Sequence, residues 1–148
     1  MKLKGVKLEH LDEVAKAIID SLDASPLAKV IHLSGELGAG KTTLVKSIAS
    51  SLGITDAVQS PTFVFMREYD SKHKKFKKLY HIDAYRFDNK DEGDILNLES
   101  LKSKNNLILI EWPEKMHAGV ADVHLNIKHK TEDTRDIYIK HKNHAEKK

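Results

Sequence analysis

The chain has 148 residues, of which 40% are apolar and 32% charged, and its formal net charge is +3 at pH 7. This composition is typical of an ordered soluble protein, and the lack of cysteine excludes disulfides, thiolate metal sites and a cysteine nucleophile. No apolar run approaches the length of a membrane span and no signal-peptide core precedes the first helix, so we expect a cytoplasmic protein without membrane contact. The small net charge gives no reason to expect DNA as a partner.

The first part of the chain predicts a helix, a strand, a glycine-rich turn and a second helix. Apolar residues recur at i, i+3, i+4 and i+7 over residues 8–22, as in an amphipathic helix. Residues 28–35 read as a short apolar strand, and the helical period returns over 41–52, with Gly53 as a plausible C-cap. A strand, a turn and a helix in this order open a βαβ unit.

The remainder predicts strands with short helical pieces between them. Residues 62–69 and 75–85 read as a hairpin, and 89–104 as short helical pieces. The run "LILIEW" (107–112) reads as a strand buried on both faces, while 122–130 and 135–142 alternate as half-exposed strands do. The sequence therefore predicts the α/β class: a single domain, residues 1–148, with a mixed sheet flanked by helices in three layers and a polar, frayed tail at about 141–148.

The most specific motif is "GELGAGKT", a full G-x-x-x-x-G-K-[ST] match that follows a predicted strand and opens a predicted helix. Such a loop turns its backbone N–H groups toward phosphate oxygens, and the helix N-terminus adds partial positive charge. We expect Lys41 to reach the β- and γ-phosphates of a nucleotide and Thr42 to offer its hydroxyl to Mg²⁺. The nucleotide-binding residues are predicted to be Gly35, Glu36, Leu37, Gly38, Ala39, Gly40, Lys41 and Thr42.

A P-loop site also needs an acid at the end of a buried strand, and the sequence offers two. "LYHID" ends at Asp83 and "LILIE" ends at Glu111. Beside a P-loop, both acids would line the crevice at the carboxyl ends of the strands. We expect these acids to steer Mg²⁺ or its bound water, and the residues alone do not divide the two roles between them.

Two further segments bear on the nucleotide. In "SPTF" (60–63), Pro61 biases the loop to an extended form, so Thr62 could present its hydroxyl to the γ-phosphate or Mg²⁺, although a simple polar strand start explains it as well. "NKDE" (89–92) resembles a guanine-reading motif but ends in Glu, and no apolar strand precedes it. We interpret "NKDE" as coincidental and expect ATP.

In this order, "GELGAGKTT", "SPTF" followed by Tyr69, "HIDAYR" and "EW" resemble the TsaE (YjeE) family, the small ATPases of tRNA threonylcarbamoyladenosine biosynthesis. The resemblance implies a P-loop fold that binds ATP and Mg²⁺, with Lys41, Thr42 and Thr43 on phosphates and metal. It implies that Glu111 is the second metal ligand, that ATPase activity depends on Asp83, and that Trp112 belongs to the site. It also implies a weak ATPase that acts on a complex of TsaB and TsaD, so that tRNA is reached only indirectly.

The sequence indicates the roles of several other positions less clearly. Arg86 follows Asp83 closely and is either an arginine finger or a salt-bridge partner, while Arg135 near the C-terminal strands could lie close to the nucleotide. The segment 89–104 departs from the family pattern, with Asn97 near an expected left-handed turn. Lys72–Lys78 is a basic stretch around Phe76, which favours a solvated hairpin tip over an RNA contact.

Two other classes of function stay open on the residues alone, and a zinc site is not expected. His124 and His129 have opposite parity on one predicted strand, so they cannot share a metal simply. A small-molecule or nucleoside kinase would usually need an arginine-bearing lid, and 89–104 contains no arginine. A nucleotide-gated binding protein with negligible hydrolysis is the third class.

Overall fold

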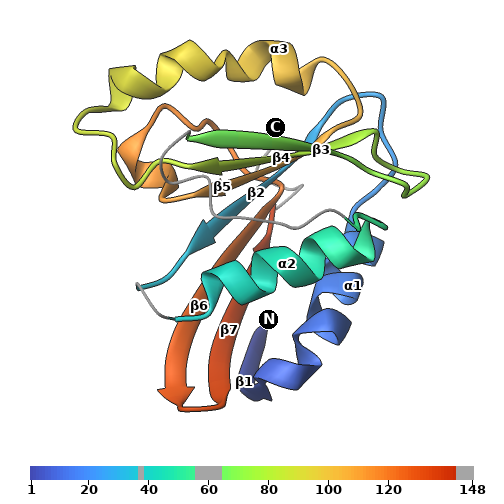
Figure 1. Ribbon diagram of the computed structural model, residues 1–148, viewed down its shortest axis with the longest axis vertical. Coiled ribbons are helices and arrows are strands. Elements are labelled where there is room, and N and C mark those ends of the chain that lie inside the picture. The colour runs from blue at the N-terminus through green and yellow to red at the C-terminus, as the bar shows by residue number, and fades with distance from the viewer. Residues whose placement is uncertain (37–38, 56–64, 143–148) are drawn as a thin grey trace.

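The computed structural model of the protein describes residues 1–36, 39–55 and 65–142. Its centre is a seven-stranded mixed sheet with the strand order β1-β7-β6-β2-β5-β4-β3 (Figure 1). The inner strands β6, β2, β5 and β4 run parallel, while β3 at one end and β7 and β1 at the other are antiparallel to their neighbours. The strands are β1 (Lys2–Lys7), β2 (Lys29–Ser34), β3 (Met66–Asp70), β4 (Lys78–Asp83), β5 (Leu107–Glu111), β6 (Val123–Thr131) and β7 (Thr134–His141).

Helices lie on both faces of this sheet, which confirms the predicted three-layer α/β fold. One face packs against α1 and α2 through the larger apolar core, and the other packs against the helical segments that flank β5 through a smaller core (Figure 1). The helices are η1 (Leu8–His10), α1 (Leu11–Ser21), α2 (Lys41–Ser51), η2 (Lys90–Leu96), α3 (Leu98–Lys102) and η3 (Pro113–Lys115), where η denotes a 3-10 helix.

The central strand β5 is buried on both faces, as its apolar run predicts. Leu107 and Leu109 belong to the core under α1 and α2, while Ile108 and Ile110 belong to the core on the opposite face. Burying a side chain of this size contributes about 1.5–3 kcal/mol. The strand is therefore fixed in register, and it delivers Glu111 to the carboxyl edge of the sheet next to Leu33 of β2.

The N-terminal strand β1 was not predicted from the sequence. It is an edge strand that pairs with β7, and its register shifts between Leu3 and Val6 around Gly5, whose φ is 63°. A short strand with a glycine irregularity and few apolar residues lacks the alternation that indicates a strand. The predicted helix over 8–22 begins as the 3-10 turn η1 and becomes α-helical at Leu11.

Two asparagines fix the backbone of residues 89–104, the segment that departs from the family pattern. Asn97 has φ 52° and ψ 61°, which confirms the left-handed turn expected there. Asn89 is the N-cap of η2, and its side chain accepts a hydrogen bond from the backbone N–H of Glu92 at 3.3 Å. "NKDE" thus starts a helix by side-chain capping, which supports its interpretation as a coincidental match to a guanine-reading motif.

The basic stretch between β3 and β4 includes residues with structural contacts. Lys75 Nζ donates to the backbone carbonyls of Leu22 at 2.7 Å, Ile19 at 3.2 Å and Asp20 at 3.3 Å, so it binds the C-terminal end of α1. Phe76 is buried in the core under α1 and α2. Lys78 forms ion pairs with Glu68 and Asp70 across the hairpin. These contacts favour the structural interpretation of the stretch over an RNA contact.

We therefore expect Lys75→Gln to lower the free energy of unfolding by about 1–2 kcal/mol, because the terminal carbonyls of α1 lose a charged donor. Urea unfolding followed by circular dichroism measures this change. Lys74→Gln is the matched control, since Lys74 is an exposed neighbour, and its unfolding midpoint should stay at the wild-type value. Equal losses in the two variants would contradict a specific capping role.

His32 on β2 is a buried titratable group, 7% exposed, whose ring lies 5.6 Å from that of His124. Burial lowers the pKa of His32 to about 4, and the nearby positive charges of His124 and Lys102 act in the same direction. The unfolded chain therefore binds a proton that the folded chain does not between about pH 6.5 and 4, so stability falls as the pH falls through this window.

The expected loss from His32 on going from pH 7 to pH 4 is roughly 3 kcal/mol. His32→Phe keeps an aromatic ring but removes the proton site, and it should reduce the difference between urea midpoints measured at pH 7 and pH 4. An unchanged pH dependence in the variant would assign the acid sensitivity to other groups.

Candidate functional site

The P-loop lies where the sequence places it, between the end of β2 and the start of α2. Ala39 N–H donates to the Glu36 carbonyl at 3.0 Å, and Gly40 is the left-handed N-cap of α2. Gly35 has φ 155°, and a Cβ there would lie 2.6 Å from the backbone oxygen of Ile127 on β6. The loop therefore needs glycine at Gly35 to pass close to β6. Leu37 and Gly38 of the predicted phosphate-binding set lie outside the described residues.

Lys41 opens α2 with its charge buried and without a hydrogen-bond partner among the described residues. The residue is 6% exposed, and its Nζ lies 4.2 Å from the centroid of the Trp112 ring. Burial lowers the pKa of Lys41, and the carboxylates of Glu111, Asp83 and Glu114 oppose this shift. An ammonium group has three donors and is costly to bury unpaired, so the site suits an anion such as a phosphate. Thr42 and Thr43 are exposed in the first turn of α2.

The two candidate acids are neighbours at the carboxyl edge of the sheet. Asp83 on β4 pairs in register with Glu111 on β5, and they are 6% and 5% exposed. Asp83 Oδ1 accepts from the Tyr85 backbone N–H at 3.0 Å. The electrostatic effect of both carboxylates on Lys41 places the acids and the P-loop lysine in one site. Carboxylate and hydroxyl oxygens are ligands that Mg²⁺ accepts, so Glu111 and Thr42 suit the metal.

Glu111 has a hydrogen-bond partner that sequence reasoning did not identify. His81 Nε2 lies 2.6 Å from Glu111 Oε2, and both side chains are buried. His81 opposes Leu109 in the β4–β5 ladder, so it is a diagonal neighbour of Glu111 on the same face. The spacing of two residues before Asp83 is the only signal of this contact.

Trp112 turns the chain at the edge of the site. It has φ 57° in the left-handed region, and its ring lies 5.1 Å from that of Tyr85. A cavity of about 430 Å³ lies between Trp112, the P-loop and β6. Its lining includes Asn126, Lys128 and His129 of β6, which sequence reasoning did not assign to the site. Alternation along β6 marks a strand but does not show which loop that strand approaches.

Arg135 is buried against the P-loop and bonds to backbone oxygens. Its Nε donates to Ala39 O at 2.8 Å, and its Nη1 donates to the carbonyls of Thr131 and Thr134, both at 2.7 Å. Arg135 is 7% exposed. The structure therefore places Arg135 behind the glycine-rich loop, where it fixes the loop backbone. The Arg86 side chain is exposed, and Thr62 lies outside the described residues.

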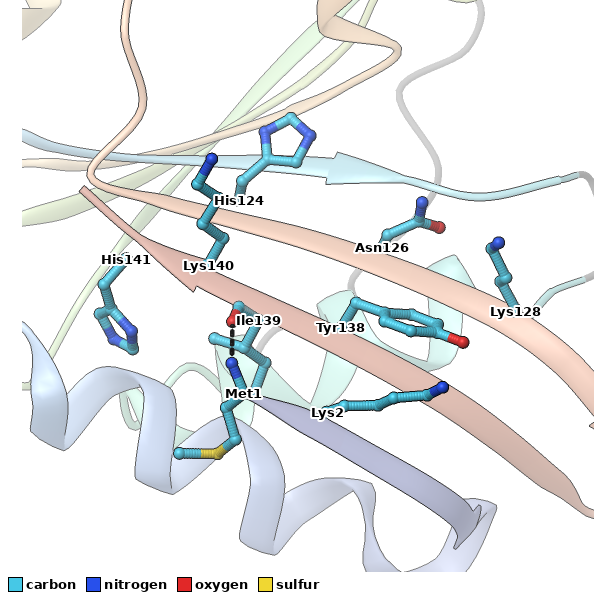
Figure 2. A pocket seen from close by; sticks show the side chains of 9 residues that line it. All are labelled: Met1, Lys2, His124, Asn126, Lys128, Tyr138, Ile139, Lys140 and His141. Carbon is cyan, nitrogen blue, oxygen red and sulfur yellow. Dashed lines mark hydrogen bonds between the residues drawn. The ribbon is translucent and has the colours of Figure 1, made fainter. Parts of the chain in front are cut away.

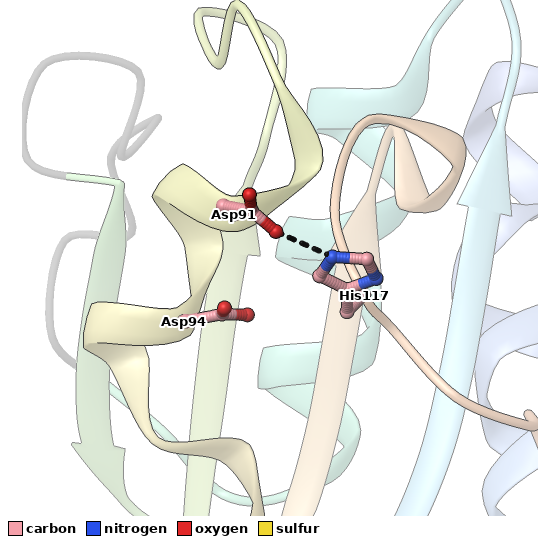
Figure 3. A group of neighbouring side chains, drawn as sticks. All are labelled: Asp91, Asp94 and His117. Atoms are coloured by element: carbon pink, nitrogen blue, oxygen red, sulfur yellow. Dashed lines mark hydrogen bonds and ion pairs between the residues drawn. The ribbon is translucent and has the colours of Figure 1, made fainter.

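A second group of possible metal ligands lies on η2 and the segment after η3. The side chains of Asp91, Asp94 and His117 come together there, and His117 Nε2 lies 2.9 Å from Asp91 Oδ1 (Figure 3). All three are exposed. Exposed acids gather in this way without an ion, so this group does not change the expectation that the protein has no zinc site.

Residues 6–137 match the family model described as "Threonylcarbamoyl adenosine biosynthesis protein TsaE". The tRNA threonylcarbamoyladenosine biosynthesis protein TsaE of Bacillus subtilis is 35% identical over 139 residues, which cover 93% of this chain and 83% of the relative. The Haemophilus influenzae TsaE is 34% identical over 114 residues, covering 76% and 70% of the two chains.

The fold agrees with these matches. The crystal structure of Bacillus subtilis YdiB superposes with a TM-score of 0.72 at 29% identity, covering 99% of this chain and 88% of that one. No helix in the described part of the chain is long and apolar enough to cross a membrane. The chain belongs to the TsaE family of tRNA threonylcarbamoyladenosine biosynthesis proteins.

Proposed function

We propose that this protein binds ATP with Mg²⁺ and hydrolyses it slowly, as the ATPase component of the tRNA threonylcarbamoyladenosine machinery. The observation that supports this most strongly is the buried Lys41 ammonium group, which has no hydrogen-bond partner among the described residues and lies beside Asp83 and Glu111. A positive group held ready at a P-loop, with acids at the adjacent strand ends, suits a Mg²⁺-bound triphosphate.

Each residue then has a distinct role in phosphoryl transfer. Lys41 would bind the β- and γ-phosphate oxygens and stabilise the charge that develops on them in the transition state. Thr42 and Glu111 would hold Mg²⁺, which supplies further charge neutralisation when bound. Asp83 would orient the attacking water and accept its proton, while His81 holds Glu111 in place by its hydrogen bond.

The loop residues and Trp112 complete the nucleotide site in this proposal. The backbone N–H groups of Gly35–Gly40 and the hydroxyl of Thr43 would cradle phosphates, and the hydroxyl of Thr62 would bind the γ-phosphate or Mg²⁺. Trp112 lines the cavity beside the loop and would exclude water from it. Arg135 would support the loop from behind through Ala39.

The partners in the proposal are TsaB and TsaD, on whose complex the ATPase acts to support turnover, in the cytoplasm. Phosphate release from ATP tests it, measured with the protein alone and with TsaB and TsaD added. Stimulation by the partners, lost in Lys41→Ala, would support the proposal. Phosphate transferred to a small acceptor would instead indicate a kinase, and tight ATP binding without release would indicate a nucleotide gate; either result would overturn it.

The metal role of Glu111 gives a separate prediction. Glu111→Gln removes one negative ligand but keeps a side chain of the same size, so we expect at least a tenfold higher Mg²⁺ concentration for half-maximal ATP hydrolysis. Titrating Mg²⁺ at fixed ATP measures this shift. Glu114→Gln is the control, because Glu114 is an exposed neighbour on η3, and its Mg²⁺ requirement should match the wild type. A wild-type Mg²⁺ requirement in Glu111→Gln would rule out the metal role.

A further inference from the structure

At the β1–β7–β6 end, the sheet has a basic face that no helix of the described residues covers. On β6 and β7, Val123, Leu125, Ile127, Ile137 and Ile139 pack into the core under α1 and α2. The alternate side chains of the two strands point to the opposite side, where the smaller core covers β2, β4 and β5 but not β6 and β7. A hollow of about 720 Å³ lies on this side of β6, β7 and β1 (Figure 2).

The lining of this hollow is cationic, with one aromatic ring at its centre. Figure 2 shows Tyr138 of β7 beside Lys2 of β1 and Lys128 of β6, with their Nζ atoms 5.0 and 5.3 Å from the ring centroid. Lys140 extends the positive charge along β7. The remaining lining residues are Met1, His124, Asn126, Ile139 and His141.

These lysines are not neutralised within the described part of the chain. Lys2, Lys128 and Lys140 form no ion pair with the described residues, unlike Lys130, which lies 3.9 Å from Asp136. Among the described residues of β1, β6 and β7, Asp136 is the acid on this face, and its Oδ1 also accepts from the Gly5 backbone N–H at 2.8 Å. The face therefore presents a net positive surface to solvent.

We propose that this open face, centred on Tyr138, binds RNA through its phosphate backbone. Lysines without ion pairs to the described residues supply the electrostatic attraction, and a half-buried tyrosine with an amide beside it on an open antiparallel sheet suits a splayed base. A protein interface would be expected to have an apolar centre. Here the apolar lining is Met1 at the edge and Ile139, which is 6% exposed.

The family shows which RNA is relevant, because its relatives are named for a modification made on tRNA. Direct contact with tRNA differs from the sequence-based expectation that tRNA is reached only through partner proteins. Asn126 and Lys128 line both this hollow and the cavity beside the P-loop, so the RNA face adjoins the proposed nucleotide site. The inference itself does not depend on ATP hydrolysis.

Fluorescence anisotropy with a labelled, unmodified tRNA transcript tests the inference at a series of salt concentrations. Lys2→Ala combined with Lys140→Ala should weaken binding about tenfold and flatten the salt dependence, by about 0.9 in log–log slope for each lysine on a duplex phosphate. Lys74→Ala combined with Lys77→Ala is the matched control. It removes the same charge from exposed positions at the β3–β4 turn and should bind as the wild type does.

Variants of Tyr138 separate the contribution of base stacking to tRNA affinity from that of the lysine charges. Tyr138→Ala should lose affinity without a change in salt slope, and Tyr138→Phe should retain it. Circular dichroism of each variant confirms that it is folded, and Lys41→Ala should keep the wild-type tRNA affinity, which separates this test from the ATPase proposal. Three results would overturn the inference: no tRNA binding by the wild type at 50 mM salt, equal losses in the turn control, or displacement of tRNA by poly-glutamate at equal charge. The last would indicate an acidic protein partner.

Discussion

Lys41→Met is expected to lower the rate of ATP hydrolysis at least 100-fold and, at the same time, to raise the stability of the nucleotide-free protein. The loss of activity follows because a single charged donor to a transition state typically contributes a factor of about 10²–10³. The gain in stability follows because Lys41 is buried without a hydrogen-bond partner among the described residues. Methionine has nearly the same shape and needs no solvation.

The lowered pKa of Lys41 also predicts that its replacement stabilises the nucleotide-free protein. Burial lowers this pKa, so the folded protein holds this proton less tightly than the unfolded chain does. The charge therefore costs stability throughout the pH range in which both states are protonated, and the cost declines only as the pH rises above the folded pKa. The wild type bears this cost wherever Lys41 is protonated in the folded state, and Lys41→Met removes it.

Phosphate release and thermal unfolding, both at pH 7, measure the two effects. Lys46→Met is the matched control, since Lys46 is exposed on the same helix, and it should change neither quantity appreciably. A lower melting temperature for Lys41→Met would show that Lys41 stabilises the free protein. Retained turnover would remove Lys41 from the proposed chemistry. General misfolding would lower both activity and stability, so it cannot produce lower activity together with higher stability.

The parts of the fold that sequence reasoning predicts are those encoded by local patterns. The strand–turn–helix around Lys41 follows from the P-loop and its flanking periodicity, and β5 from its unbroken apolar run. Asp83 and Glu111 were expected in one crevice because each ends a buried strand, and the β4–β5 register pairs them. Asn97 was expected in a left-handed turn because asparagine tolerates that backbone.

Contacts between distant segments could not be predicted from such patterns. The bond from Arg135 to Ala39 spans 96 positions, and β1 is recognisable only once β7 is available to pair with it. The contact of His81 with Glu111 depends on β4 and β5 being parallel neighbours, which no single segment encodes. The same holds for the basic face, whose lysines come from β1, β6 and β7.

Arg135→Ala is expected to have a large effect, because this one side chain bonds two segments of backbone, the glycine-rich loop and the turn between β6 and β7. Its Nε and Nη1 donate to the carbonyls of Ala39, Thr131 and Thr134 from a buried position. Alanine leaves these carbonyls without their charged donor, so we expect the free energy of unfolding to fall by about 2–4 kcal/mol. ATP should also bind more weakly, because the loop that contains Ala39 loses its support.

The combination of these two effects distinguishes a residue that supports the loop from one that contacts the nucleotide directly. A loop support lowers stability without nucleotide present, whereas a contact residue would weaken ATP binding and leave the nucleotide-free protein unchanged. Urea unfolding without nucleotide, together with the Kd for ATP, measures both. Arg135→Lys should resemble alanine, since an ammonium lacks the planar fork that reaches several carbonyls. Lys130→Ala controls for lost charge on the neighbouring strand and should cost less than about 0.5 kcal/mol, because its ion pair with Asp136 is partly exposed.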